Sequence, residues 1–461
     1  MKITVSNVIV VTDATPDVNA WCKKELTLPN PEYAKKVRMG FWVGNTPKTI
    51  NLYEVNGNTI SVPYGCLYQI PDLLDAYIHS DLPKNKYVYF GDKQMELYDY
   101  QQKAVDVLAD KKKGILIAPA GSGKTVTGIH LVKRLSQKAL WITNKKELLE
   151  QAKNTALQVM DKSLIGEITE GKVNIGRGIT FATVQTLANL DLPRYKYEWN
   201  CIIVDESHNI GSNANSTMMF QKVLNNLAAR HKYGLTATAH RSDGLIKAMY
   251  CFLNGIAHEV PESEVADKIM KVGIKPVSTG VELSRACLNT DGTLNYAKLI
   301  NYLGSHADRN FKIYYELTDN KNKSCLILSA RLEHLTHLIS VLPDEMQDRA
   351  VMVSGKMTTK KGKLEREQAI EDMRTGKKKY LFATYSLAKE GLDIPCLERL
   401  FLTTPVKDYA VVTQSIGRIA RTHEGKAKPI VYDFVDNIPY CVKAYKQRCR
   451  HYRKGGAYFV D

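Results

Sequence analysis

The sequence lacks the features that place a chain in a membrane or in an oxidising compartment. No apolar stretch approaches the roughly 20 residues that span a bilayer, and the start MKITVSNVIVVTD has no signal-peptide layout. The nine cysteines are scattered, with no CxxC pair and no metal-like Cys/His spacing. This pattern is typical of reduced thiols and predicts neither disulfides nor structural zinc. We therefore expect a cytoplasmic protein without a membrane partner.

Acidic residues are also scarce relative to basic ones. The 461 residues contain 48 Asp+Glu against 64 Lys+Arg, a formal net charge of +16. A basic surface releases counterions when it covers phosphates, so a nucleic acid is a natural partner. An ordinary solvated basic surface is the alternative. The charge thus indicates a class of partner without naming a function.

Apolar runs predict an α/β protein of several parts. Residues 1–90 form a small N-terminal α+β module, with a strand in KITVSNVIVV and a hairpin around Asn56–Gly57. Residues 91–258 and 259–436 each show short apolar strands separated by helical stretches, which predicts two tandem parallel-sheet lobes. The expected strands are KKGILIAPA, KALWITN, GITFATV, NCIIVDES and KYGLTATA, then SCLILSA, DRAVMVSG, KYLFATYS, RLFLTTP and KPIVYDFV. Residues 255–320 read only as a connecting or lobe-edge region.

The segment APAGSGKT, Ala118 to Thr125, predicts a phosphate-binding loop between a strand and a helix. Glycines let backbone N–H groups turn towards phosphate oxygens, and the helix N-terminus adds its dipole. Lys124 is expected to reach the β- and γ-phosphates, and the Thr125 hydroxyl to hold Mg²⁺. The cofactor-binding residues expected in this loop are Ala120, Gly121, Ser122, Gly123, Lys124 and Thr125.

Two adjacent carboxylates end the apolar run CIIVDESHNI. Beside a phosphate-binding loop, Asp205 fits a magnesium ligand and Glu206 fits the group that deprotonates the attacking water. The alternative is an acidic strand end facing solvent. Further along, QSIGRIART places Arg418 and Arg421 three residues apart, on one face of an expected helix. Such arginines can neutralise charge on a γ-phosphate or pair with surface acids.

The series APAGSGKT, DESH, TATA and QSIGRIART, in this order, resembles the superfamily 2 helicases and translocases. LYDYQQKAV, TNKKELLEQ, ATVQTL, LILSARLEHL and ATYSLAKEGLDIP match further motifs of that superfamily, over roughly residues 95–435. The resemblance implies two RecA-like lobes that hydrolyse ATP with Mg²⁺ and grip a nucleic-acid backbone.

The resemblance also implies roles for individual residues. Gln101 is expected to bind adenine, with Tyr98 or Tyr100 stacking on it, and Gly391 and Asp393 to line the nucleotide. Gln414, Arg418 and Arg421 are expected to act at the γ-phosphate, beside Lys124, Asp205 and Glu206. His208, Thr236 and Thr238 are expected to couple ATP to nucleic acid. The expected DNA contacts are Asn144, Lys145, Thr183, Gln185, Ser329, Arg331 and Thr384, although hydroxyls and amides in loops often only cap turns.

DESH and the following GLTATAHRSDG resemble the group of phage branch-migration helicases of the UvsW type and the XPB-like enzymes. The front module resembles that of compact phage helicases, including the phage T5 type. These resemblances imply an ATP-dependent DNA helicase acting on branched or forked DNA in recombination or repair, with other replication or recombination proteins as partners. If the chain is phage-encoded, its place is the host cytoplasm.

Three other functions remain open. The chain can be an RNA helicase or remodeller, a DNA-translocase subunit of a restriction-type complex, or a clamp that uses ATP only as a switch. Residues 437–461 hold six Lys/Arg, one Asp and four interleaved tyrosines. This basic tail can lie along DNA or dock its tyrosines on the second lobe.

Overall fold

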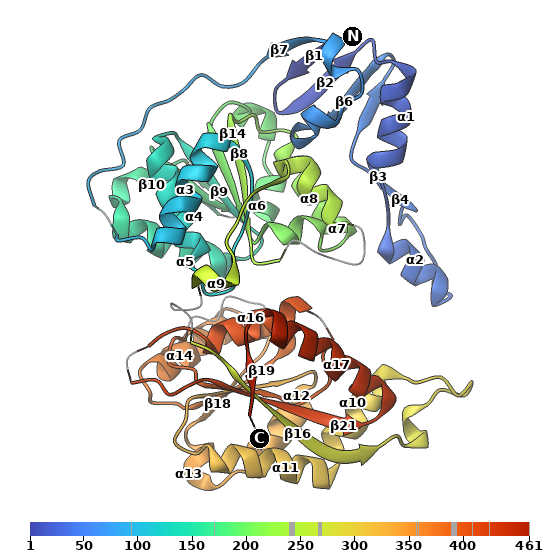
Figure 1. Ribbon diagram of the computed structural model, residues 1–461, viewed down its shortest axis with the longest axis vertical. Coiled ribbons are helices and arrows are strands. Elements are labelled where there is room, and N and C mark those ends of the chain that lie inside the picture. Colours follow the sequence, from blue (N-terminus) through green and yellow to red (C-terminus); the bar gives the residue numbers. More distant parts are fainter. Residues whose placement is uncertain are drawn as a thin grey trace. The chain divides into compact units, whose positions relative to one another are not determined.

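The computed structural model describes residues 1–93, 95–169, 171–238, 245–265, 270–355, 357, 359–388, 394–407, 409–423 and 425–460. Its contacts divide the chain into two compact units (Figure 1). The first holds residues 1–119 and 123–261, and the second holds residues 262–461 and 120–122. Among the described residues, no helix combines the length and the apolar character needed to cross a bilayer.

The N-terminal module is a five-stranded sheet in the order β5-β6-β2-β1-β7. Its elements are β1 (Lys2–Val5), β2 (Val8–Thr12), α1 (Pro16–Glu25), β3 (Thr27–Pro29), α2 (Pro31–Arg38), β4 (Thr49–Asn51), β5 (Glu54–Asn56), β6 (Thr59–Pro63) and β7 (Tyr77–Ser80). The hairpin around Asn56–Gly57 is confirmed, with Gly57 at φ +59°. The prediction of one strand in KITVSNVIVV was wrong, because the chain turns at Ser6 and Asn7 and pairs β1 antiparallel with β2.

The first lobe carries an eight-stranded sheet in the order β11-β10-β12-β9-β13-β14-β8-β15. Its strands are β8 (Lys113–Ile117), β9 (Ala139–Thr143), β10 (Ile165–Thr169), β11 (Lys172–Asn174), β12 (Ile179–Thr183), β13 (Cys201–Asp205), β14 (His231–Thr236) and β15 (Ile256–Glu259). Helices α3 (Asp99–Lys111), α4 (Lys124–Leu135) and α5 (Lys146–Val159) cover one face, and α6 (Val184–Ala188), α7 (Ala214–Leu224) and α8 (Ile246–Leu253) the other (Figure 1). Only β11 pairs antiparallel, so the sheet is parallel over its centre.

The second unit carries a seven-stranded sheet in the order β18-β19-β17-β20-β21-β16-β22, in which every described pairing is parallel. Its strands are β16 (Gly273–Glu282), β17 (Cys325–Ser329), β18 (Ala350–Val353), β19 (Tyr380–Thr384), β20 (Arg399–Leu402), β21 (Ile430–Asn437) and β22 (Tyr458–Phe459). Its helices are α9 (Glu262–Val265), α10 (Tyr296–Ser305), α11 (Ala307–Asp319), α12 (Leu332–Ser340), α13 (Asp344–Gln347), α14 (Lys360–Arg374), α15 (Tyr385–Ala388), α16 (Tyr409–Ile419) and α17 (Pro439–Lys454).

The two parallel sheets confirm the predicted pair of tandem RecA-like lobes. Each of the ten apolar runs forms a strand, because a central parallel strand is buried on both faces and reads as a continuous apolar run. The segment 255–320 holds a long strand of the second sheet, β16, where only a connecting or edge region was expected. Gly273, Pro276 and Gly280 interrupt its alternation and hid it.

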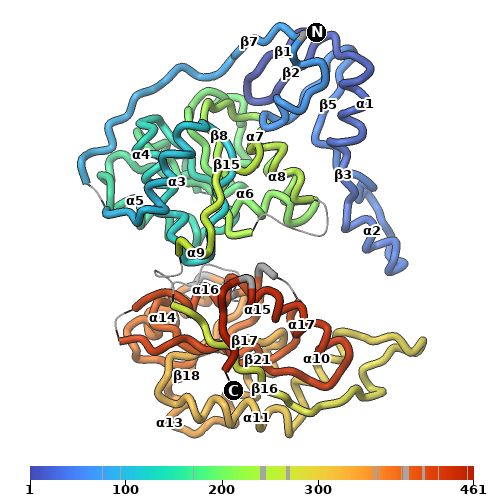
Figure 2. The backbone as a smooth tube through the Cα atoms, viewed as in Figure 1, coloured from blue at the N-terminus to red at the C-terminus, as the bar shows by residue number. Residues whose placement is uncertain are grey.

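The module and the first lobe share one continuous hydrophobic core. Gly65 of the module packs against the backbone of α8, where a Cβ at this position would lie 2.5 Å from the Cys251 carbonyl oxygen. The segment that leads from β7 to α3 runs along the lobe, and Val88 N–H donates to Ser136 O over 2.9 Å (Figure 2). The module is therefore fastened to the lobe at two places.

The residues expected as a basic tail are packed on the second lobe. Arg448 and Tyr452 of α17 are buried, and both bind the carboxylate of Asp433 in β21, the arginine through two bonds of 2.9 and 2.6 Å. Residues Tyr458–Phe459 then add β22 beside β16. Of the two alternatives for this segment, the structure has the docked one.

Candidate ATP site and nucleic-acid surface

The phosphate-binding loop connects β8 to α4 at the carboxyl end of the first sheet. Gly121 and Gly123 adopt φ +85° and +76°, conformations that cost a glycine little. Helix α4 begins directly after the loop, with Gly123 at its N-cap position, so the positive end of the helix dipole lies at the loop. Lys124 Nζ lies 3.3 Å from the carbonyl oxygens of Ala118 and Pro119. The loop therefore forms the concave, donor-lined cradle that suits phosphate oxygens.

Gln101 touches this loop from α3. Its Oε1 accepts the Tyr98 N–H over 3.0 Å, and its Nε2 would lie 2.5 Å from a Cβ at position 123. The Tyr98 and Tyr100 rings stack with centroids 5.7 Å apart. Tyr98 is half exposed, whereas burial raises the pKa of Tyr100 to about 12. A stacking role for adenine thus suits Tyr98 better than Tyr100.

Asp205 and Glu206 stand at the end of β13, where the chain turns sharply. Glu206 adopts the left-handed region at φ +47°, which ends the strand and starts the 3₁₀ turn η5 (Ser207–Gly211). Asp205 is buried and its Oδ1 accepts the Glu206 N–H over 2.9 Å. Burial, and then the charge of Glu206, raise the pKa of Asp205 to about 7, and Lys124 opposes this rise. Two adjacent carboxyl groups, of which Asp205 is buried, favour a bound cation.

Thr125 and Asp205 are the residues that would hold Mg²⁺ here. Across the described ranges, no group of three or more His, Cys, Asp and Glu side chains is arranged to hold a metal. Magnesium is typically held in proteins through one or two carboxylates together with the phosphates of a substrate. When bound, the ion neutralises charge on phosphate oxygens.

The three expected coupling residues form one connected network with Glu206. His208 Nδ1 lies 3.3 Å from Glu206 Oε2 and 3.1 Å from Thr236 Oγ1. Thr236 Oγ1 donates to Thr238 O over 2.8 Å and accepts the Thr238 N–H over 3.1 Å. Because the one hydroxyl hydrogen goes to Thr238 O, His208 Nδ1 is the donor to Thr236, and the Glu206 carboxylate lies beside the same nitrogen. Thr236 at the end of β14 and Thr238 just after it are thereby linked to the carboxylates at the end of β13.

The expected DNA contacts of the first lobe meet at one edge of its sheet. Thr143 and Thr183 are register partners at the carboxyl ends of β9 and β12. Gln185 Nε2 donates to Asn144 O over 3.1 Å, and Lys145 stands at the N-cap position of α5. Thr183 also caps α6 through the Thr186 N–H, so part of its role is structural.

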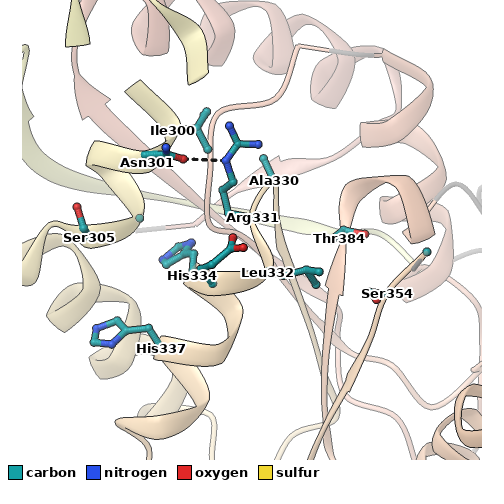
Figure 3. A pocket seen from close by; sticks show the side chains of 13 residues that line it. Ile300, Asn301, Ser305, Ala330, Arg331, Leu332, His334, His337, Ser354 and Thr384 are labelled. Atoms are coloured by element: carbon teal, nitrogen blue, oxygen red, sulfur yellow. Dashed lines mark hydrogen bonds between the residues drawn. The ribbon is translucent and has the colours of Figure 1, made fainter. Parts of the chain in front are cut away.

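Two of the three expected contacts of the second lobe lie at a cavity of about 1090 Å³ at the carboxyl ends of β17 and β19 (Figure 3). Arg331 and Thr384 line it, and Arg331 Nε donates to Asn301 Oδ1 of α10 over 2.8 Å. Ser329, the register partner of Thr384, is fully buried. In this conformation the Ser329 hydroxyl cannot reach a nucleic acid. It instead positions the segment that follows β17.

A relay of hydrogen bonds holds the Arg331 segment. The Arg331 N–H donates to Ser329 Oγ over 3.2 Å, and Ser329 Oγ lies 3.0 Å from His334 Nδ1. His334 Nε2 donates to Asn310 Oδ1 over 3.0 Å, since the Asn310 amide already donates to Gly304 O. Burial, then the Arg309 charge, lower the pKa of His334 to about 3, so the ring stays neutral. Sequence reasoning missed Asn301 and Asn310, which lie in the poorly readable segment 255–320.

The arginine segment differs from the predicted helix. Gln414 and Arg418 lie on α16, but the helix ends at Ile419 and Arg421 lies beyond it. The physical reason is that the Ala420 carbonyl accepts the Met270 N–H over 2.8 Å, which directs the chain away from the helix. The prediction that Arg418 and Arg421 share one helix face was wrong. Gly391 and Asp393 and the segment His240–Gly244 lie outside the described residues.

Two family models match the chain, and together they span more than half of it. The type III restriction enzyme res subunit model matches residues 94–241, and the helicase conserved C-terminal domain model matches residues 308–423. The chain belongs to the superfamily 2 helicases. It is therefore an ATP-dependent nucleic-acid helicase.

Individual proteins similar to this helicase come from several sources. "Probable helicase D10" of Escherichia phage T5 is 24% identical over 94% of this chain and 90% of its own. "Putative ATP-dependent RNA helicase L396" of Acanthamoeba polyphaga mimivirus is 26% identical over 84% of this chain and 72% of its own. A solved structure described as a fragment of "a putative HsdR subunit of a type I restriction enzyme from Vibrio vulnificus YJ016" shares the fold, with a TM-score of 0.58. It is 17% identical over 80% of this chain and 69% of its own.

Proposed function

We propose that this helicase remodels branched or forked DNA, as a helicase or translocase in recombination or repair. The observation that carries the proposal is the correspondence with the phage T5 helicase, which covers 94% of this chain. An alignment of that extent must include most of the N-terminal module as well as both lobes. We therefore take the phage helicase as the guide to the class of substrate on which this chain acts.

The proposed cycle uses groups on both lobes. Lys124 and the loop glycines hold the phosphates of ATP, and Glu206 deprotonates the attacking water. The second lobe acts on the γ-phosphate through Gln414, Arg418 and Arg421. Loss of the γ-phosphate on hydrolysis therefore weakens the state in which the two lobes are closed on ATP. Asn144, Lys145, Thr183 and Gln185 grip the sugar-phosphate backbone from one lobe, and Arg331 and Thr384 from the other. Gripping the backbone needs no sequence reading, in agreement with the net charge of +16.

Two other functions are supported by specific similarities. The mimivirus relative is named an RNA helicase, and the HsdR fragment belongs to a restriction enzyme. An RNA motor or a restriction-type DNA translocase would use the same ATP site. These functions differ in the nucleic acid that stimulates hydrolysis and in whether strands are separated.

The test is the ATPase rate with single-stranded DNA, blunt duplex, RNA, a fork and a four-way junction. Strongest stimulation by the fork and the junction is expected, together with strand separation on those substrates. Stimulation by RNA alone would establish the RNA motor, and equal stimulation by blunt duplex without strand separation would establish the translocase. Glu206→Gln serves as the blank, because loss of a general base lowers turnover roughly 10²–10⁴-fold.

A further inference from the structure

The N-terminal module carries a projecting arm made of β3, α2, the loop 39–48 and β4. The base of this arm is anchored, since Leu28 of β3 and Ile50 of β4 are buried in the shared core. Across the arm, Asn30 Nδ2 donates to Pro47 O over 2.8 Å and its N–H donates to Lys48 O over 3.1 Å. Beyond this closure, α2 and the loop extend away from the module sheet (Figures 1 and 2).

The tip of the arm exposes large apolar side chains. No residue of α2 is buried, and Val37 and Met39 are more than half exposed. Phe41 is 61% exposed and Trp42 is 88% exposed. A single exposed apolar residue is ordinary, but two adjacent aromatic rings at the end of an extension mark an interaction site.

The exposed indole rests on the loop that carries it. The Trp42 ring packs on Gly44, where a Cβ would lie 2.9 Å from Cζ3 of the ring. The loop that carries both residues is tied to α2, since Phe41 N–H donates to Lys36 O over 2.9 Å and Lys36 Nζ to Thr46 Oγ1 over 2.6 Å. An aromatic platform held in this way loses little conformational freedom when a flat partner stacks on it.

The positive charge of the module is concentrated on the same arm. Residues 1–90 hold nine Lys/Arg against eight Asp/Glu. Four of the basic residues lie in residues 30–48, with Glu32 as the single acid there, while the rest of the module has more acids than bases. The four are Lys35, Lys36, Arg38 and Lys48. Glu32 lies 3.9 Å from Lys36, so the charge of the other three is not offset on the arm.

We propose that the arm binds an unpaired strand of the nucleic acid on which this helicase acts. Trp42 and Phe41 stack on exposed bases, and Lys35, Arg38 and Lys48 contact phosphates. Aromatic rings interleaved with basic side chains are the surface that proteins use for single strands, because every base has a π-face and every linkage a charge. The inference rests on the proposed nucleic-acid motor and names the part of the module that engages its substrate.

Trp42 itself provides the test, because it is the most exposed of the four tryptophans. Trp141 and Trp199 are buried and Trp21 is partly buried. Titration of the full chain with oligothymidylate or with a fork is expected to quench the Trp42 emission, and titration with a blunt duplex is not. Trp42→Phe should abolish the quenching and keep the affinity, because a ring remains for stacking.

The double variant Phe41→Ala, Trp42→Ala should bind the oligonucleotide roughly tenfold more weakly, as measured by the anisotropy of a labelled strand. Tyr77→Ala is the matched control, since it removes a 67% exposed ring from β7 of the same module. Its affinity and its basal ATPase should both equal those of the wild type.

Each remaining outcome overturns the inference in a recognisable way. In one outcome the wild-type emission does not change on titration, and the double variant binds the oligonucleotide as tightly as the wild type. If nucleic acid still stimulates the ATPase, this result would exclude the arm as a binding site and leave the proposed motor in place. Equal quenching by blunt duplex would exclude base stacking. If no nucleic acid binds the protein or stimulates its ATPase, both the proposed function and the proposed role of the arm are wrong. The exposed tip would then be a protein-binding surface.

Discussion

At the scale of single residues, the Thr236 hydroxyl links the end of β14 to the end of β13 in the candidate ATP site of the first lobe. It touches His208, which in turn touches Glu206, and it holds both the N–H and the carbonyl of Thr238. The end of β14 is therefore connected to the Glu206 carboxylate through the His208 ring, whose Nδ1 lies 3.1 Å from Thr236 Oγ1 and 3.3 Å from Glu206 Oε2. The geometry favours a relay role for the hydroxyl over a purely structural one.

Thr236→Val is expected to separate hydrolysis from its stimulation. Valine keeps the shape and removes the oxygen, so basal ATPase should stay within about twofold while stimulation by nucleic acid falls several-fold. A buried hydroxyl also contributes about 1 kcal/mol to stability. Thr180→Val is the control, because Thr180 is equally buried and its hydroxyl bonds Trp199 and Gly176 outside the network. Equal loss of stimulation in both variants would contradict the relay.

Lys232 is a buried charge at the seam between the module and the first lobe. Its Nζ lies 3.1 Å from Leu224 O and 4.8 Å from the centroid of the Tyr64 ring. Burial lowers the pKa of this ammonium to about 7, against 10.5 for an ordinary lysine. Between these two values the unfolded chain binds more protons than the folded one, so stability rises with pH across that window.

Lys232→Met removes this pH dependence. The free energy of unfolding of the wild type should rise with pH relative to that of the variant, by up to about 1.4 kcal/mol per pH unit between pH 7 and 10. Urea unfolding followed by tryptophan emission measures it, because all four tryptophans lie in the first unit. A difference between the two proteins that does not change with pH would show that Lys232 keeps its proton.

At the scale of elements, the segment after β17 depends on the side chain at the end of that strand. Ser329 receives the Arg331 N–H and faces His334, which is fixed by Asn310 of α11. The strand end, α11 and α12 thus hold one arginine at the mouth of the cavity in Figure 3. Ser329 acts through Arg331, whereas the guanidinium is the group available to a phosphate.

Two variants distinguish these roles by their salt dependence. Arg331→Ala removes a phosphate contact and should lower the slope of log affinity against log salt by about 1. Ser329→Ala should weaken binding several-fold and leave the slope unchanged, because the charge remains. Lys377→Ala is the control, since Lys377 is exposed and lies 3.4 Å from Asp372 on another part of the lobe. An unchanged slope in Arg331→Ala would remove this residue from the binding surface.

The sequence was informative where the physical signal is local. Ten strands are apolar runs, nine of them inside their sheets and β18 at an edge, and the phosphate-binding loop and Asp205–Glu206 carry their chemistry within a few residues. The relay of Ser329, His334 and Asn310 joins three elements, and no spacing in the sequence announces it. Likewise the end of α16 is set by a bond to Met270, about 150 residues away, which no helix signal near Arg421 reports.

At the scale of the whole molecule, the module is part of the first unit rather than an appendage. Gly65 allows the close approach to α8, because a Cβ there would lie 2.5 Å from Cys251 O and 2.7 Å from Tyr250 O. Removal of residues 1–90 would expose the side of the core that the module now covers. Function of the module is therefore better tested by changes on its surface than by deletion.

Gly65→Ala should destabilise the first unit by about 1–3 kcal/mol, the typical result of overpacking a close contact. Gly255→Ala is the matched control, because a Cβ there meets nothing within 4 Å and its φ is ordinary. Thermal unfolding monitored by tryptophan emission compares the two. Equal melting temperatures of the two variants would show that the contact between the module and α8 accommodates a methyl group without loss of stability.

The pairing of β16 has a consequence for how the second unit folds. This strand is the first of its sheet along the chain, yet Gly273 pairs with Ile430 on one side and with Tyr458 on the other. Closing such long loops costs entropy before any contact repays it, and folds rich in distant pairings form slowly. The earliest strand of the second unit must therefore wait for the last ones, with its edges open to other chains until they arrive.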